Sequence, residues 1–274
     1  MPVYDAPARM NPHRILPLAC ALLWGCATAP GDPNDPEGLL ASSAIVAERD
    51  VERSDTIEVA RFSREPAGSP PGQWQPFVIL PATPHTQYRL VATSEGTVLE
   101  GNADRSASGL YRRIRIDPKS HPVVEWRWNV AQPVRGADAR IPSREDSPAR
   151  LVISFHGDIK RLDFQERITL RLYKGLTGQT LPYAMLMYIW AGNLPAETTI
   201  PSDHTAKIQM IVMPGDAGQV GQWVAFRRNV LEDYRRVFGE DPSDIVAVGV
   251  MTDSDDTGQQ ARALYGDITF LRAQ

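Results

Sequence analysis

The feature that most constrains the fold is an alternation of side chains along residues 123–130. One side of this segment carries two valines and two tryptophans, and the other carries Glu125, Arg127 and Asn129. Successive side chains of a β-strand point to opposite faces of the sheet. The segment therefore predicts a strand with one buried face, and Trp126 and Trp128 are expected in the core.

Nine further segments predict short strands separated by turn residues: 88–92, 97–101, 110–116, 150–155, 184–190, 207–213, 222–227, 245–252 and 264–271. Ten short strands are typical of a β-sandwich or barrel. The fold class expected is mainly β, an antiparallel β-sandwich with two flanking helices.

The two helices are predicted at residues 163–176 and 229–238. In the second segment Asn229 is an N-cap residue, Glu232 follows three positions later, and Gly239 stands just past the end. In the first segment four large apolar residues recur every four positions, which favours a helix although a shorter alternation is also present: Phe164, Ile168, Leu172 and Leu176.

The chain has 274 residues, 42% of them hydrophobic, and a formal net charge of -4. This composition is that of a globular protein with a sizeable core. Lysine and arginine form no basic stripe, so nucleic acid is not expected as a partner.

The only two cysteines, Cys20 and Cys26, lie in an N-terminal region with the layout of a secretory signal. His13 and Arg14 precede an apolar run at residues 15–25, which is shorter than the roughly 20 residues of a membrane-spanning helix. The run ends in LWGC at 23–26, which resembles the lipobox of bacterial lipoproteins. An ordinary N-terminal helix with incidental cysteines is the alternative, and Met10 is an alternative start.

The lipobox predicts lipid on Cys26, through which the chain would bind a membrane. Ala27 rather than Asp follows, which indicates the bacterial cell envelope at the outer membrane, facing the periplasm. The predicted organisation is a signal segment at 1–26, a proline-rich flexible tether at 27–54 and one folded domain at 55–274.

A cluster of carboxylates marks the segment DSDDTG at residues 253–258. Asp253, Asp255 and Asp256 could supply the oxygen ligands that calcium prefers, so calcium is the one candidate metal here, and no other cofactor is predicted. Leu264 stands where an EF-hand loop has its glutamate. A turn that binds a polar ligand, or a purely structural turn, remains open.

Further candidate ligand-binding residues could converge with this turn on one polar pocket: Glu125, Arg127, Asp146, Arg150, Trp190 and Arg228. The charged residues could equally be ordinary surface charges. Trp190, just before Ala-Gly-Asn, is the best candidate for stacking on a sugar ring. No G-x-S-x-G elbow or H-x-x-x-H pair is present, and no catalytic residue is predicted.

Several phrases together resemble a bacterial family known only as domain of unknown function 3047: SASGL at 106–110, EWRW at 125–128, EDSPAR at 145–150, YIW at 188–190, RNVLEDY at 228–234, FGE at 238–240, DSDDTG at 253–258 and YGDI at 265–268. They cover roughly residues 55–270. The resemblance implies a jelly-roll sandwich of the galactose-binding kind and an envelope setting. It implies no activity, since fold alone does not define function.

These observations predict a lipid-anchored extracytoplasmic binding module for a glycan or another polar envelope ligand, without catalytic activity. One alternative is a hydrolase or lyase that acts on envelope polysaccharide through two of the carboxylates. The other is a structural envelope protein whose polar phrases hold loops in place.

Overall fold

The computed structural model describes residues 54–203, 205–215 and 217–273. Contacts between Cα atoms divide the chain into Met1–Gly31 and Asp32–Gln274, and all described residues belong to the second unit. The predicted signal segment, Cys26 and the predicted tether up to residue 53 lie outside the described residues.

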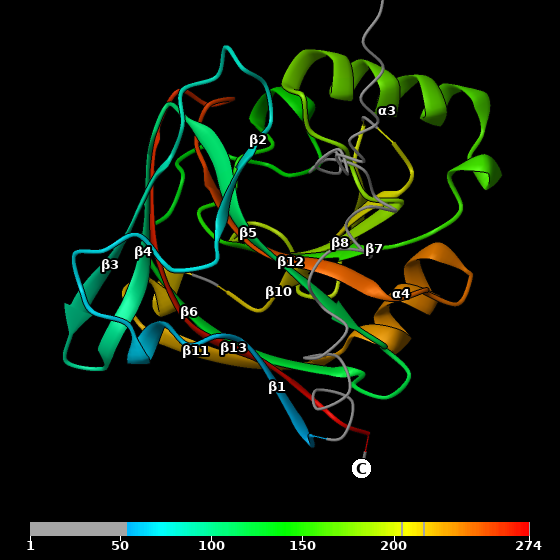
Figure 1. The fold of residues 1–274 in the computed structure, drawn as a ribbon. Helices are drawn as coiled ribbons and strands as arrows, with labels where there is room; N and C mark the ends of the chain where they lie inside the picture. Colours follow the sequence, from blue (N-terminus) through cyan, green and yellow to red (C-terminus); the bar gives the residue numbers. More distant parts are fainter. Residues whose placement is uncertain (1–53, 204, 216, 274) are drawn as a thin grey trace, which may run out of the picture. The chain divides into compact units, whose positions relative to one another are not determined.

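Two β-sheets pack face to face (Figure 1). The six-stranded sheet has the spatial order β11 (Trp223–Asn229), β6 (Val123–Gln132), β13 (Gln260–Leu271), β4 (Gly96–Asp104) and β3 (Gln87–Thr93), and β1 (Thr56–Ala60) pairs with β13. The seven-stranded sheet has the order β2 (Gln75–Val78), β5 (Ala107–Ile116), β12 (Ile245–Asp253), β7 (Arg150–Phe155), β8 (Ala184–Trp190), β10 (Ile208–Met213) and β9 (Thr199–Pro201).

The alternating strand β6 forms part of the core, as its sequence predicts. Its inward residues Val124, Trp126, Trp128 and Val130 are at most 3% exposed. The Trp126 ring lies 5.1 Å from the ring of Tyr188 on the opposite sheet. Apolar side chains from the two sheets therefore exclude water from each other, which is the main stabilising contribution in a sandwich.

Strand β8 is buried along its whole length because both of its faces are covered. Leu186 and Tyr188 face the other sheet, while Met185, Met187 and Ile189 pack in a second apolar cluster on the outer side. Strands β8 and β10 are parallel, whereas the other strand pairs among the described residues are antiparallel. This double coverage explains the continuous apolar run AMLMYIW.

Both predicted helices are present. Helix α3 (Phe164–Thr177) begins after Asp163, whose side chain forms a capping box with Glu166, and ends at Gly178 in the left-handed conformation. Helix α4 (Val230–Phe238) begins after Asn229 and ends at Gly239, also left-handed. Short 3-10 helices occupy Phe62–Arg64, Pro142–Arg144, Ile159–Arg161 and Ala217–Gln219.

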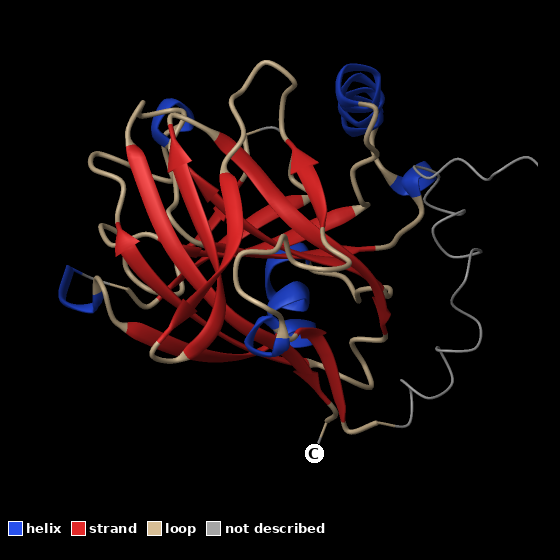
Figure 2. Cartoon of the chain, turned by 60° about the vertical axis from the view of Figure 1, so that its left-hand side comes forward, coloured by secondary structure: helices blue, strands red, loops and turns tan. Residues whose placement is uncertain are grey.

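The two helices occupy different places on the sandwich (Figures 1 and 2). Helix α3 lies on the outer side of the seven-stranded sheet, whereas α4 contacts β6 and β11 and packs Tyr234 against Phe155 between the sheets. In the described part of the chain, neither helix combines the length and apolar character needed to cross a bilayer.

The predicted sandwich with two flanking helices is confirmed. All ten predicted strands are found, and three additional short ones, β1, β2 and β9, were not predicted. Strands β2 and β9 lie at the two edges of their sheet and contain Pro76 and Pro201. Proline cannot donate to a strand ladder, so these segments carry a weak strand signal and are confined to edges.

Candidate functional site

Strand register brings the two acidic segments of the sequence together. Strands β12 and β7 are antiparallel neighbours, and Met251 pairs with Arg150. The end of β12 therefore lies beside the residues that precede β7. As a result Asp253 and Asp146, more than a hundred positions apart in the chain, belong to one cluster at this end of the sandwich.

Arg150 and Asp253 form a buried, two-pronged ion pair. The guanidinium Nε donates to Oδ1 of Asp253 at 3.0 Å and Nη2 donates to Oδ2 at 2.6 Å. Nη1 also donates to Oε1 of Glu145 at 2.8 Å, and the backbone N–H of Ser147 donates to Asp253. Removal of one partner of such a pair leaves a buried charge, which typically costs about 3–5 kcal/mol. The pair therefore joins the start of β7 to the end of β12.

The pair also changes how both groups titrate. Burial raises the pKa of Asp253 to about 7, and the positive charge of Arg150 opposes this rise. Burial lowers the pKa of Arg150, but the charges of Asp253 and Glu145 outweigh it and raise that pKa. Because both oxygens of Asp253 already accept hydrogen bonds from Arg150, this side chain is committed to the protein itself.

A second carboxylate cluster stands beside this pair, formed by Asp146, Asp255 and Asp256. One oxygen from each lies within 4.8 Å of the others. Asp146 is buried and accepts hydrogen bonds from the backbone N–H groups of Asp256 at 3.2 Å and Thr257 at 2.8 Å. Asp255 and Asp256 are exposed.

Partial burial, together with repulsion between the carboxylates, raises pKa values in this cluster. Burial, followed by the charge of Asp255, raises the pKa of Asp256 to about 6, and burial also raises the pKa of Asp255. Three carboxylate oxygens are suitable ligands for a hard cation, but calcium takes six to eight. Of the three predicted calcium ligands, Asp255 and Asp256 belong to this cluster, whereas Asp253 binds Arg150 and Asp146 stands in its place.

A pocket of about 420 Å³ opens next to Asp146, between the loop that joins β6 to β7 and the end of β8. We call it the Trp190 pocket. Its aromatic wall is Trp190, and its polar lining groups are Asp138, Arg144, Asp146 and Asn193. The hydroxyl of Ser147 donates to the carbonyl of Trp190 at 2.8 Å, which connects the pocket to the buried ion pair.

Glycines hold the Trp190 ring in place. A Cβ atom at Gly192 would lie 2.6 Å from the indole, and one at Gly215 would lie 2.4 Å from it. Both distances are far below van der Waals contact, so only glycine permits this close packing. The ring is buried, with 9% exposure, and belongs to the core as well as to the pocket wall.

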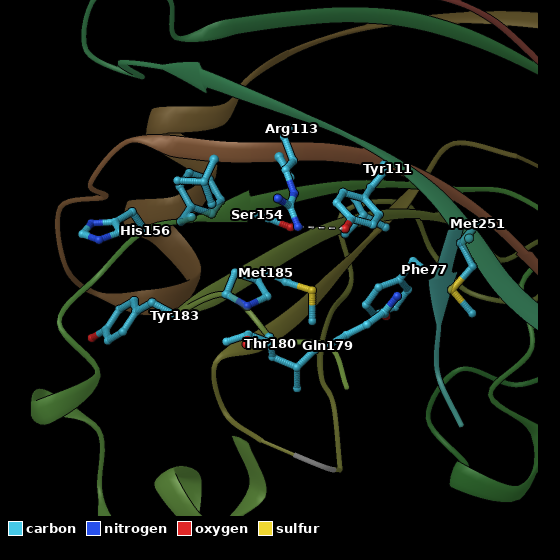
Figure 3. A pocket seen from close by; sticks show the side chains of 18 of the residues that line it. Phe77, Tyr111, Arg113, Ser154, His156, Gln179, Thr180, Tyr183, Met185 and Met251 are labelled. Carbon is cyan, nitrogen blue, oxygen red and sulfur yellow. Dashed lines mark hydrogen bonds between the residues drawn. The ribbon is translucent and has the colours of Figure 1, made fainter. Parts of the chain in front are cut away.

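A second pocket, which the sequence did not predict, lies on the outer face of the seven-stranded sheet (Figure 3). We call it the sheet-face pocket, and its cavity volume is about 110 Å³. Gly109 and Gly249, on neighbouring strands, line the floor of this pocket, and the rings of Phe77, Tyr111 and Tyr183 surround it. The lining is mostly apolar. Glycine inside a strand is the signal that could have indicated this hollow.

The remaining predicted residues take part in other contacts. Glu125 pairs with Arg227 on the six-stranded sheet. Arg127 pairs with Glu95 at 3.0 Å and lies 4.5 Å from the centre of the Trp223 ring. Among the described residues these side chains line neither of the two pockets, and their partly exposed pairs are those of a solvated sheet face.

Arg228 belongs to a separate network at the start of α4. Its guanidinium binds Asp233, at 2.9 Å from Nε and 2.7 Å from Nη2, and it also binds Glu197. The hydroxyl of Tyr188 donates to the same Asp233 carboxylate at 2.8 Å. The structure thus joins Asp146, Arg150, Trp190 and the three carboxylates of the 253–258 turn, and it places Arg228 in another group.

The fold and these cavities define a class of protein: a two-sheet β-sandwich with one pocket at an end of the sandwich and a second, more apolar pocket on an outer face. Within that class, the chain belongs to the family described as "Protein of unknown function (DUF3047)", whose model matches residues 72–269. The family resemblance seen in the sequence is therefore confirmed. No curated protein matches the chain.

Solved structures of similar fold include the endoglucanase Cel12A from Rhodothermus marinus, at 11% identity and a TM-score of 0.43, which covers 80% of this chain and 100% of that chain. The xylan-binding module CBM15 shows 12% identity and a TM-score of 0.34, with coverages of 80% and 97%. The xyloglucanase domain of NopAA from Sinorhizobium fredii, in complex with cellobiose, shows 6% identity and a TM-score of 0.40. The match covers 78% of this chain and 100% of that chain. At these identities the likeness concerns the fold.

Proposed function

We propose that this protein is a lipid-anchored, extracytoplasmic binding module for a glycan or a similarly polar ligand of the bacterial envelope, and that the ligand binds in the Trp190 pocket. The lipobox at Cys26 supports the anchor and the location at the outer membrane. The chemistry of the pocket supports the ligand class.

The observation that carries the proposal is the combination of one aromatic wall with several polar groups in a cavity of about 420 Å³. Pockets of roughly 300–1,000 Å³ with a few convergent polar groups are typical small-molecule sites. A sugar ring has an apolar face, which can pack on an indole, and hydroxyls, which need hydrogen-bond partners. Arg144 and Asn193 supply donors and acceptors of this kind, whereas both oxygens of Asp146 already accept hydrogen bonds from residues 256 and 257.

The sheet-face pocket fits a polar ligand less well. Its cavity is about a quarter of that size, and its walls are mostly apolar side chains. Its lining does include polar side chains, among them Arg113, Ser154 and Gln179, but a larger share of its wall is apolar than in the Trp190 pocket. The two pockets therefore provide a matched comparison for an experiment.

Isothermal titration and thermal-shift measurements with xylo- and cello-oligosaccharides and with fragments of envelope glycans test the proposal. Asn193→Ala and Arg144→Ala, both in the Trp190 pocket, are expected to weaken binding about tenfold or more, because each removes a hydrogen-bonding group. Ser154→Ala, in the sheet-face pocket, is the control and should leave affinity unchanged. Equal affinity in all three variants, or no ligand that raises the melting temperature, would contradict the proposal.

The same titrations with and without calcium test the cation expected at the carboxylate cluster. Calcium should raise the melting temperature of the wild-type protein and not that of Asp256→Asn, since the variant loses one carboxylate ligand. For the anchor, Cys26→Ser should release the protein from the membrane fraction. Unchanged fractionation would show that lipid on this cysteine does not hold the protein there.

One observation favours a second candidate, a hydrolase or lyase on envelope polysaccharide. The pKa of Asp256, raised to about 6 beside the Asp255 carboxylate, is the kind of perturbation found in carboxylic acids that transfer protons. Turnover of an envelope polysaccharide that disappears in Asp255→Asn and in Asp256→Asn would establish this function. Binding without turnover would leave the binding module as the function.

A further inference from the structure

Helix α3 carries a stripe of large apolar side chains that faces away from the protein. Phe164, Ile168, Leu172 and Leu176 are 68%, 37%, 61% and 63% exposed. Residues four positions apart are displaced by about 40° around a helix, so these four side chains span roughly 120° of its surface. They make up four of the six exposed large hydrophobic residues of the described chain.

The opposite side of α3 fixes the helix to the sandwich. Leu170 packs against the core, and the hydroxyl of Tyr173 donates to the carbonyl of Val78 on β2 at 2.5 Å. The carboxylate of Glu166 accepts hydrogen bonds from the backbone of Asp163 and from the hydroxyl of Thr205. Because these contacts set the rotation of the helix, the apolar stripe is held toward solvent.

Basic residues flank the exposed stripe. Arg167, Arg171 and Lys174 follow one of its edges, and Lys160 and Arg161 lie in the 3-10 helix just before α3. The only acidic residue of α3 is Glu166, which is engaged in the capping box. An apolar face bordered by Lys and Arg is the pattern of helices that lie in the interface of an anionic membrane.

A second copy of the chain fits this surface less well. Stable protein interfaces bury about 800 Å² on each partner, and one stripe of four side chains offers roughly half of that. Two such helices would also bring their arginines close together, which is unfavourable. The charge of the flank and the small area both favour a lipid surface over self-association.

We propose that α3 docks the folded domain on an anionic phospholipid surface, with the stripe Phe164, Ile168, Leu172 and Leu176 inserted among the headgroups. The docking does not require lipid on Cys26 and is separate from ligand binding in the Trp190 pocket. It orients the domain, because the helix axis must lie parallel to the membrane plane. The seven-stranded sheet then faces the bilayer, and its partner sheet faces away from it.

Vesicle flotation tests the proposal with the full chain carrying Cys26→Ser, so that no attached lipid contributes. Vesicles contain phosphatidylcholine with or without phosphatidylglycerol. Leu172→Ser with Leu176→Ser, in the same background, is expected to weaken partitioning about a hundredfold, because two inserted side chains are lost. Arg167→Gln with Arg171→Gln should weaken binding roughly tenfold for the anionic vesicles only. Leu80→Ser, another exposed leucine, is the control and should bind as the parent does.

Hydrogen exchange locates the contact. Amides of residues 164–177 should exchange more slowly when phosphatidylglycerol vesicles are added. Unchanged exchange in α3, or equal partitioning of the parent and the double-leucine variant, would overturn the proposal. So would a dimer in solution that the double-leucine variant dissociates, since the stripe would then bind a second copy.

Discussion

Helices α3 and α4 begin and end in the same way, but only α4 contributes buried residues to the core. Each begins after a side chain that caps it, and each ends at a glycine in the left-handed conformation. In α4 the residues Val230, Asp233 and Tyr234 are buried, whereas no residue of α3 is buried. The apolar stripe of α3 is exposed instead.

The difference shows that the period of a hydrophobic pattern identifies a helix without showing which face is buried. In α3 the apolar residues that recur every four positions face solvent. The apolar contacts of the inward side come from Leu170 and Tyr173, which are only half-buried. In α4 the inward ring of Tyr234 lies 4.5 Å from Phe155 of β7. Four predictions follow from this comparison.

The largest loss of stability is expected when the inward-facing tyrosine of each helix is replaced by alanine. Tyr234→Ala in α4 should lower the free energy of unfolding by about 3–5 kcal/mol, because it leaves a cavity between the sheets. Tyr173→Ala in α3 should cost about 1–2 kcal/mol, since that ring is only half-buried. Urea denaturation measures both. Equal losses would show that α3 contributes to the core as much as α4.

The second-largest difference in stability is expected when the fourth residue of each helix is replaced, Asp233 in α4 and Arg167 in α3. Asp233→Ala should cost about 2–4 kcal/mol, because it removes the acceptor that Arg228 and Tyr188 share in a buried setting. Arg167→Ala should change stability by less than about 0.5 kcal/mol. Thermal unfolding at neutral pH gives both values, and a large loss for Arg167→Ala would contradict the partly exposed position of this side chain.

Replacement of the N-cap residues, by Asp163→Ala in α3 and Asn229→Ala in α4, is expected to lower the free energy of unfolding by about 1 kcal/mol each. The two losses should appear in different measurements. Loss of the α4 cap should lower global stability, because α4 is packed between the sheets, whereas loss of the α3 cap should mainly speed amide exchange within residues 164–177. If both variants lowered only the global melting temperature, α3 would unfold together with the sandwich.

The smallest effect on stability is expected for the exposed stripe itself. Leu172→Ser and Leu176→Ser should each change the free energy of unfolding by less than about 0.5 kcal/mol, close to the value for Leu80→Ser. Chemical denaturation of the three variants in parallel checks this. A substantially larger loss at either α3 position would mean that the side chain is buried against the protein in solution.

The candidate site was predicted in part. The carboxylate turn and the EDSPAR segment stood out in the sequence, and the structure joins them because β12 and β7 are neighbours in the seven-stranded sheet. Glu125 and Arg127 resembled the other polar candidates, yet their strand presents them on the side of its sheet opposite to Trp126 and Trp128. The sheet-face pocket is lined by residues of several neighbouring strands, among them Gly109 and Gly249, and such pairing is not visible along the chain.

The amino-acid sequence alone determined both helices and ten of the thirteen described strands: apolar patterns specified these strands, and caps with terminal glycines specified the helices, because these preferences act within a few residues. The tertiary structure alone decided which strands became neighbours, which acidic groups met, and which helix face was covered. Those outcomes depend on the competition among many residues for a limited buried volume, and no single segment of the chain contains that information.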